Sequence, residues 1–145
     1  NNVSASVGAV LKPAGFDNVQ GVITAAYLMD PTDPAWAEHA DMKAFKGWMA
    51  KYHPTAHLAD LGNVSGYTVS FLMAETLRRC GDQLTRANVM KQAASFQKFR
   101  VPMLLPGITV STSATDYYPI QAVQLQRFKG QSWELFGEIL QAESS

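Results

Sequence analysis

Residues 21–28 have the composition of a buried strand, and this segment ends abruptly. It is apolar and partly β-branched, and it is followed closely by Asp30-Pro31 and Asp33-Pro34. Each proline lacks an N–H group and holds the preceding residue in an extended conformation, so neither pair can continue a hydrogen-bonded ladder. The chain must therefore leave its sheet here, and its route after this point limits the folds that are possible.

Helices are predicted on both sides of this strand. The apolar spacing and the capping residues predict a helix at 4–11, capped by Asn2 or Ser4 and ended by Pro13 and Gly15. They also predict a helical region from Asp33 to Pro54 and a helix that begins near GNVSG, with Asn63 or Ser65 as its cap, and stops at Gly81. A last helix is predicted from Thr85 to about Phe96.

The C-terminal part changes from helical to strand periodicity. Inward and outward positions alternate over 122–128, Lys129-Gly130 provides a turn, and residues 132–140 return as a second strand. The predicted order is helix, strand, three helices and a hairpin. This order is typical of an α/β protein, but it holds too few strands for a parallel sheet. We therefore expect the rest of that sheet to be missing from this chain.

Composition excludes several classes of protein. The 12 basic and 12 acidic residues balance, and the only basic pair is Arg78-Arg79, so we expect no nucleic-acid partner. No apolar run approaches the roughly 20 residues that span a bilayer. Cys80 is the single cysteine, which excludes an internal disulfide. Because the chain starts at Asn1 with neither a start methionine nor a signal peptide, we interpret it as a mature chain or a piece of a longer one.

The sequence offers no convincing catalytic or metal site. His53 and His57 have helical metal-site spacing, but Pro54 lies between them and His39 is distant. Ser65 is one place late for a G-x-S-x-G elbow, so a hydrolase triad with one of the histidines is a minor hypothesis. Glu134 and Glu138 could imitate a catalytic acid pair, but we interpret them as part of the solvent-exposed face of the hairpin. We expect no catalysis, no cofactor and no metal.

The N-terminal turn is the one candidate binding feature. A helix that opens at Val3 or Ser4 would direct backbone N–H groups and a partial positive charge toward the space above Asn1 and Asn2, which favours a carboxylate. Simple capping by asparagine and serine is the alternative, and the sequence leaves both open.

Four stretches in order, GVITAAYLMDPTDPAW, GYTVSFLMAETLRRCGDQLTRANVMKQAA, MLLPGITVSTSATDYYPIQAVQLQRFKG and SWELFG, resemble one family. They are similar to the C-terminal part of ABC-transporter substrate-binding proteins of the branched-chain amino acid type, the Leu/Ile/Val-binding family. Its members have a two-lobed type I periplasmic binding fold, also called a Venus flytrap. The resemblance covers almost the whole chain.

The resemblance implies a division of the chain between two lobes. Residues 1–29 would end the second lobe, 30–34 would cross to the first lobe, 35–116 would pack on it as helices, 117–119 would cross back, and 120–145 would form the C-terminal hairpin of the second lobe. The hinge residues implied are Met29, Asp30, Pro31, Tyr118 and Pro119.

The resemblance also implies a function. A small molecule would be captured between the lobes and delivered to a membrane ABC permease, in the periplasm and after removal of a signal peptide. The turn Asn1, Asn2, Val3 and Ser4 matches a loop that faces the cleft. Amino-acid receptors of the family tend to have an acidic residue there, so the asparagines argue against a plain amino acid and favour an aromatic or aliphatic carboxylate. A small amino acid is kept as the other candidate ligand.

Two further expectations follow from the resemblance. The same fold also serves as the extracellular ligand-binding domain of sensors, which is the alternative function. In addition, the helices of residues 33–96 should have apolar faces that cover a sheet absent here. We therefore expect either the missing N-terminal part of the receptor or a swapped copy of this chain to cover them.

Overall fold

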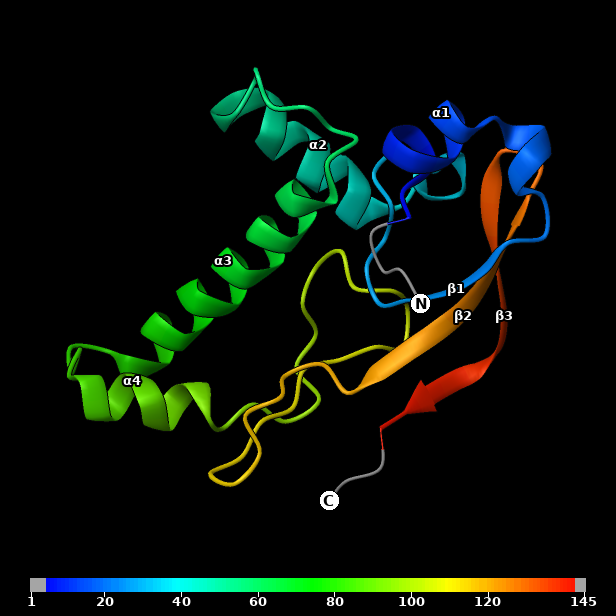
Figure 1. Ribbon diagram of the computed structural model, residues 1–145. Helices are drawn as coiled ribbons and strands as arrows, with labels where there is room; N and C mark the ends of the chain where they lie inside the picture. Colours follow the sequence, from blue (N-terminus) through cyan, green and yellow to red (C-terminus); the bar gives the residue numbers. More distant parts are fainter. Residues whose placement is uncertain (1–4, 143–145) are drawn as a thin grey trace.

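The structure is a computed structural model, and it describes residues 5–142. Helices α2–α4 lie to one side of a three-stranded sheet, and the irregular segment 94–121 runs between them (Figure 1). The elements in chain order are a π-helical turn Val7–Leu11 continued by α1 (Lys12–Ala14), a 3-10 turn Phe16–Val19, β1 (Ile23–Ala26), a 3-10 turn Pro34–Trp36, α2 (Ala40–Tyr52), α3 (Leu61–Cys80), α4 (Arg86–Ala93), β2 (Ala122–Lys129) and β3 (Ser132–Gln141).

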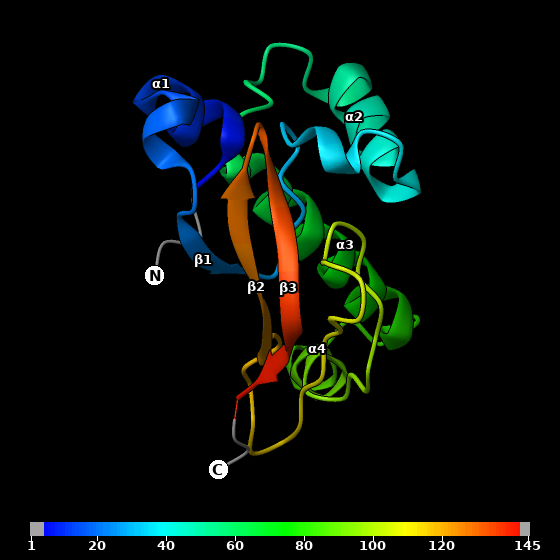
Figure 2. The same ribbon diagram turned by 90° about the vertical axis from the view of Figure 1, so that its right-hand side faces the viewer.

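The sheet has the order β1-β2-β3, and both pairs of strands are antiparallel (Figure 2). The predicted hairpin is confirmed, with Gly130 at a positive φ of 65° in its turn. β1 pairs with β2 across about a hundred residues of sequence, from Ile23 opposite Arg127 to Ala26 opposite Gln124. The structure is therefore mixed α/β, as expected, and the first predicted strand is joined to the hairpin.

The N-terminal helix differs from the prediction at both ends. Its first turn begins at Val7 and is capped by Ser6, whose Oγ accepts from the Ala9 N–H at 3.1 Å, so the predicted start at Ser4 is wrong. Pro13 does not end the helix but lies inside α1, because a proline in the first turn of an α-helical segment gives up no obligatory hydrogen bond. The stop at Gly15 is confirmed by its φ of 86°.

The later helices follow the predicted pattern with shifted boundaries. The region from Asp33 to Pro54 is two elements, a 3-10 turn capped by Asp33 and α2 capped by His39. Asp60 caps α3, so the prediction of Asn63 or Ser65 is wrong. Thr85 caps α4 as predicted, but this helix ends at Ala93 rather than near Phe96.

Two clusters of buried side chains hold these elements together. The larger cluster joins α2, α3 and residues 96–110 around Met42, Phe45 and Met103, each with no exposed surface. The smaller one packs the N-terminal helix on the tip of the hairpin, and its buried members are Val7, Leu11, Phe128 and Trp133. The outer face of α3 is covered by neither cluster, because Val69, Met73 and Leu77 are exposed along it.

Candidate functional site

Asp30, one of the predicted hinge residues, is buried and fastens its segment to the N-terminal helix. Its Oδ2 accepts from the Val7 N–H at 2.5 Å. Its Oδ1 accepts from the backbone N–H and the hydroxyl of Thr32 at 2.8 and 2.7 Å. The Thr32 Oγ1 in turn accepts from the Gly8 N–H at 2.8 Å. This carboxylate and hydroxyl thus satisfy the first N–H groups of the helix, which have no intrahelical partners.

Asp33 makes a second attachment, to the hairpin. Its Oδ2 accepts from the Trp133 N–H at 2.8 Å, and its Oδ1 accepts from the Ala35 N–H at 2.8 Å. Burial raises the pKa of Asp33 above its ordinary value, the two N–H donors oppose that rise, and the nearby Asp30 carboxylate adds to it. A buried carboxylate that accepts two backbone N–H groups has both oxygens engaged, so it holds two segments of chain together.

The segment just before these aspartates runs beside residues 103–105. The Met29 N–H donates to the Met103 carbonyl at 2.9 Å, and the Leu105 N–H donates to the Tyr27 carbonyl at 2.8 Å. Met103 is fully buried with a φ of 69°, a conformation that is uncommon for a residue with a side chain. Residues 27–29, which lead into the first predicted crossing, are therefore bonded to residues 103–105, and Asp30, Pro31 and Asp33 of that crossing are buried.

The second predicted crossing is different because it is exposed. Tyr117 and Tyr118 have 64% and 78% of their surface open to solvent. The turn is held by Asp116, whose Oδ1 accepts from the Tyr118 N–H at 3.0 Å, and by Gln121, whose amide donates to the Tyr118 carbonyl at 3.0 Å. Its link to the preceding segment is the Ser111 N–H bonded to the Pro119 carbonyl at 3.2 Å. All of these bonds are local.

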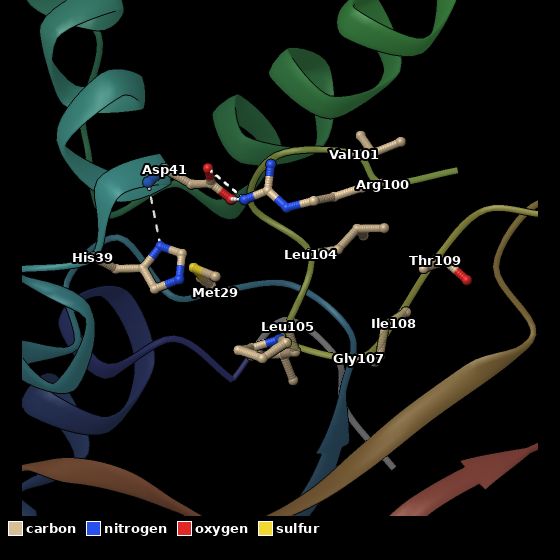
Figure 3. A pocket seen from close by; sticks show the side chains of 11 residues that line it. Met29, His39, Asp41, Arg100, Val101, Leu104, Leu105, Gly107, Ile108 and Thr109 are labelled. Atoms are coloured by element: carbon tan, nitrogen blue, oxygen red, sulfur yellow. Dashed lines mark hydrogen bonds and ion pairs between the residues drawn. The ribbon is translucent and has the colours of Figure 1, made fainter. Parts of the chain in front are cut away.

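A pocket of about 310 Å³ lies beside the first crossing (Figure 3). Its apolar wall includes Met29, and its polar side is formed by three residues that pair with one another. The Arg100 guanidinium donates to both carboxylate oxygens of Asp41 at 2.8 and 2.7 Å, and the Asp41 N–H donates to His39 Nδ1 at 3.2 Å. This pairing fixes the loop at Arg100 to the start of α2, which explains these residues without a ligand.

A more apolar groove lies between α3 and the two ends of the hairpin. It has a volume of about 640 Å³ and is lined by Tyr27, which follows β1, by Pro119 of the second crossing and by Val69 of α3. The remaining lining residues come from the two ends of the hairpin, at 120–123 and 140–142. Three of the five predicted hinge residues, Met29, Asp30 and Pro31, are thus buried, while Tyr118 and Pro119 lie on the exposed second crossing.

The four predicted ligand-binding residues, Asn1, Asn2, Val3 and Ser4, lie outside the described residues. What the structure does describe is the helix that follows them. The N–H groups of Val7, Gly8 and Ala9 are bonded to Asp30, Thr32 and Ser6 respectively. They are therefore engaged by the protein itself, and a ligand carboxylate would have to find its donors elsewhere.

Other candidate features gain no support. Between residues 5 and 142, no group of three or more His, Cys, Asp or Glu side chains is arranged to hold a metal ion. No helix in the same range has the length and apolarity needed to cross a bilayer. Ser65 lies in α3, and within the described chain no hydrogen bond joins it to His39, His53 or His57. The hydrolase hypothesis therefore has no geometric basis.

Comparison with known proteins bears on the fold. No protein-family model matches the chain, and no curated protein matches it. The chain is similar to the crystal structure of a branched chain amino acid ABC transporter from Thermus thermophilus with bound valine, with a TM-score of 0.73 and 14% sequence identity. The match covers 92% of this chain and 36% of that one. At this identity the likeness shows the fold alone.

This match indicates the class of protein to which the fold belongs. The chain has the mixed α/β fold of part of a substrate-binding protein of the branched-chain amino acid ABC-transporter type, so the resemblance read from the sequence is confirmed at the level of fold. It spans only 36% of the length of the structure that it matches.

Proposed function

We propose that this chain is part of the solute-binding component of an ABC transporter, and that it acts by binding rather than by catalysis. The observation that carries the proposal is the fold likeness over 92% of the chain to a transporter structure with bound valine. The proposed receptor has two lobes that move relative to each other, and the larger buried cluster joins helices α2 and α3 to Ala26 of β1 and Ala122 of β2 where these lobes would meet. Closure of such lobes about connecting segments is a common way to enclose a small ligand.

The outer face of α3 supports the proposal that a further part of the receptor packs here. Val69, Met73 and Leu77 follow one another at four-residue spacing, which places them on one stripe of the helix. An exposed apolar stripe of this kind normally marks a contact surface. Since the matched protein has nearly two thirds of its length beyond the match, we assign the stripe to the first lobe of the same receptor. A swapped copy of this chain is the alternative outcome.

The ligand we propose is an amino acid or an aromatic or aliphatic carboxylate, bound between the lobes with Asn1, Asn2, Val3 and Ser4 at the edge of the cleft. An asparagine can donate to a carboxylate, whereas an aspartate at the same place would repel it and would favour an ammonium group. The protein would work in the periplasm and pass its ligand to a membrane permease.

Thermal shift and calorimetry on the full-length receptor test this function. We expect at least one of L-valine, L-leucine, L-phenylalanine, benzoate and 3-methylbutanoate to bind. At a hundredfold excess over its Kd, that ligand should stabilise the folded protein by about 2.7 kcal/mol. The matched control is the corresponding amide, such as valinamide or benzamide, which lacks the carboxylate and should bind more weakly. A panel without a single binder would contradict the proposal.

A single substitution tests which class of ligand binds. Asn2→Asp should weaken the binding of a simple carboxylate, because it places a second negative charge near the first. The same variant should spare or improve an amino acid whose ammonium group faces that position. Unchanged affinity for both classes would exclude Asn2 from the site.

A further inference from the structure

The two crossings differ in how they are held, and this difference bears on how the proposed receptor would close. The first one is attached to the N-terminal helix by Asp30 and Thr32 and to β3 by Asp33. The second one is exposed at Tyr117 and Tyr118, and the hydrogen bonds described for residues 117–119 come from within residues 111–121. The nearest longer link is the Ala142 N–H, which donates to the Gln121 carbonyl at 2.6 Å.

The first crossing is attached by hydrogen bonds to buried carboxylates, which are among the stronger hydrogen bonds in proteins. Asp30 and Asp33 are buried, with 6% and 2% of their surface exposed. A hydrogen bond from a backbone N–H to a buried carboxylate cannot be exchanged for water without opening the structure, so breaking one leaves an unpaired buried donor. Residues 30–33 are tied at both ends, which leaves little freedom for backbone rotation within them.

Close packing adds a second constraint that does not depend on hydrogen bonds. A Cβ placed on Gly8 would lie 2.9 Å from both Thr32 Oγ1 and Thr32 Cγ2. Only glycine lets the helix backbone approach the Thr32 side chain this closely. The N-terminal helix and the first crossing therefore fit together without space for one to slide on the other.

We propose that residues 30–33 form a rigid strap fastened to the body made of the N-terminal helix and β3. Asp33 is the positioning residue of that strap, and lobe rotation bends the second crossing at 117–119 instead. The inference rests on the proposed function, since it concerns the movement of the two lobes. Of the two crossings expected from the sequence, one is then a rigid connection and the other a flexible one.

Asp33→Asn is the variant that tests the attachment. An asparagine has one acceptor oxygen, so it can keep the bond from Ala35 or the bond from Trp133 but not both; its NH2 group faces the other N–H. Amide hydrogen exchange at residues 35 and 133 of the full-length protein should accelerate at least ~10-fold at one or both sites. The matched control is Asp17→Asn, at an exposed aspartate, and it should change neither amide.

The movement is followed by distance measurements on the same full-length protein. Spin labels at Ala87 of α4 and Glu138 of β3, both exposed, report the separation of the two lobes. In the Asp33→Asn variant we expect a broader distribution of distances without ligand and a weaker ligand affinity. A role confined to overall stability would lower the melting temperature and leave the distribution unchanged.

Exchange on the unaltered protein keeps the inference testable if the variant fails to fold. On closure with a ligand from the panel above, the amides at 35 and 133 should stay protected while those at 117 and 118 change. Loss of protection at 35 and 133 on closure would overturn the rigid strap. If no ligand binds, the proposed function fails, whereas the exchange comparison without ligand still decides whether Asp33 fastens the strap. Gly8→Ala, which pushes on Thr32, should weaken the strap in the same direction.

Discussion

The exposed stripe on α3 gives a quantitative prediction about what this chain does without the rest of a receptor. Burying a whole side chain of this size is worth roughly 1.5–3 kcal/mol, and Val69, Met73 and Leu77 are 65%, 51% and 43% exposed. Burying these exposed parts is therefore worth about 2–5 kcal/mol, before the entropic cost of association. Because a micromolar complex needs roughly 8 kcal/mol, we expect the 145-residue chain to self-associate only weakly through this face, toward the upper end of the micromolar range or above.

Met73→Lys should weaken that association at least about tenfold, because it removes apolar area and places like charges opposite each other. Sedimentation velocity between about 5 and 200 μM measures the effect. The matched control is Ala87→Lys, which adds the same charge at an exposed position of α4 and should leave association unchanged.

In the full-length receptor the same substitution should lower the stability of the folded protein. There the stripe is covered, so Met73→Lys should lower the free energy of unfolding by about 2–4 kcal/mol, while Ala87→Lys stays within about 0.5 kcal/mol. Urea denaturation gives both values. A monomeric isolated chain together with a harmless Met73→Lys in the receptor would refute the assignment of this face.

Three other predictions concern stability and are measured on the full-length protein. Phe45→Ala should cost about 3–5 kcal/mol in urea unfolding because this ring is fully buried in the larger core, and a cost below about 1 kcal/mol would show that the core is not packed as described. Asp60→Ala should cost about 1 kcal/mol by removing the cap of α3, whereas Asn63→Ala should leave that cap bond intact and should not accelerate exchange at the Gly62 amide. Since the pKa of Asp33 is raised on folding, the folded state binds its proton more tightly than the unfolded state. Melting temperatures between about pH 7 and pH 4 should therefore show the parent protein gaining stability relative to Asp33→Asn as the pH falls, and a constant difference would contradict the raised pKa.

Local chemistry made part of this fold predictable from the sequence. The hairpin follows from strand alternation on both sides of Lys129-Gly130, and the caps at Asp33 and Thr85 follow from short polar side chains placed before helical runs. The start of α3 was predicted at Asn63 or Ser65, and this prediction overlooked Asp60, which is an equally good cap. The structure selects Asp60 and gives Asn63 another partner, the His57 carbonyl at 2.9 Å.

Long-range partners were not predictable. The aspartate-proline pairs showed where the strand had to end, but nothing nearby in the sequence indicated that Asp33 bonds to Trp133, 100 residues away. His39 was not recognised as the cap of α2, because histidine is not among the residues that usually cap helices. The candidate ligand turn, Asn1 to Ser4, stays a prediction, and so does the assignment of segments to two lobes.

The pairing of β1 with β2 also determines when this protein can fold during synthesis. Residues 23–26 leave the ribosome about a hundred residues before their partners at 124–127, and closing so long a loop is entropically costly. Until then the edge of β1 that pairs with β2 is open, and Trp133, which anchors Asp33, has not been made. This part of the sheet is therefore completed only after β3 has emerged, which makes the nascent polypeptide dependent on protection from aggregation until that strand is made.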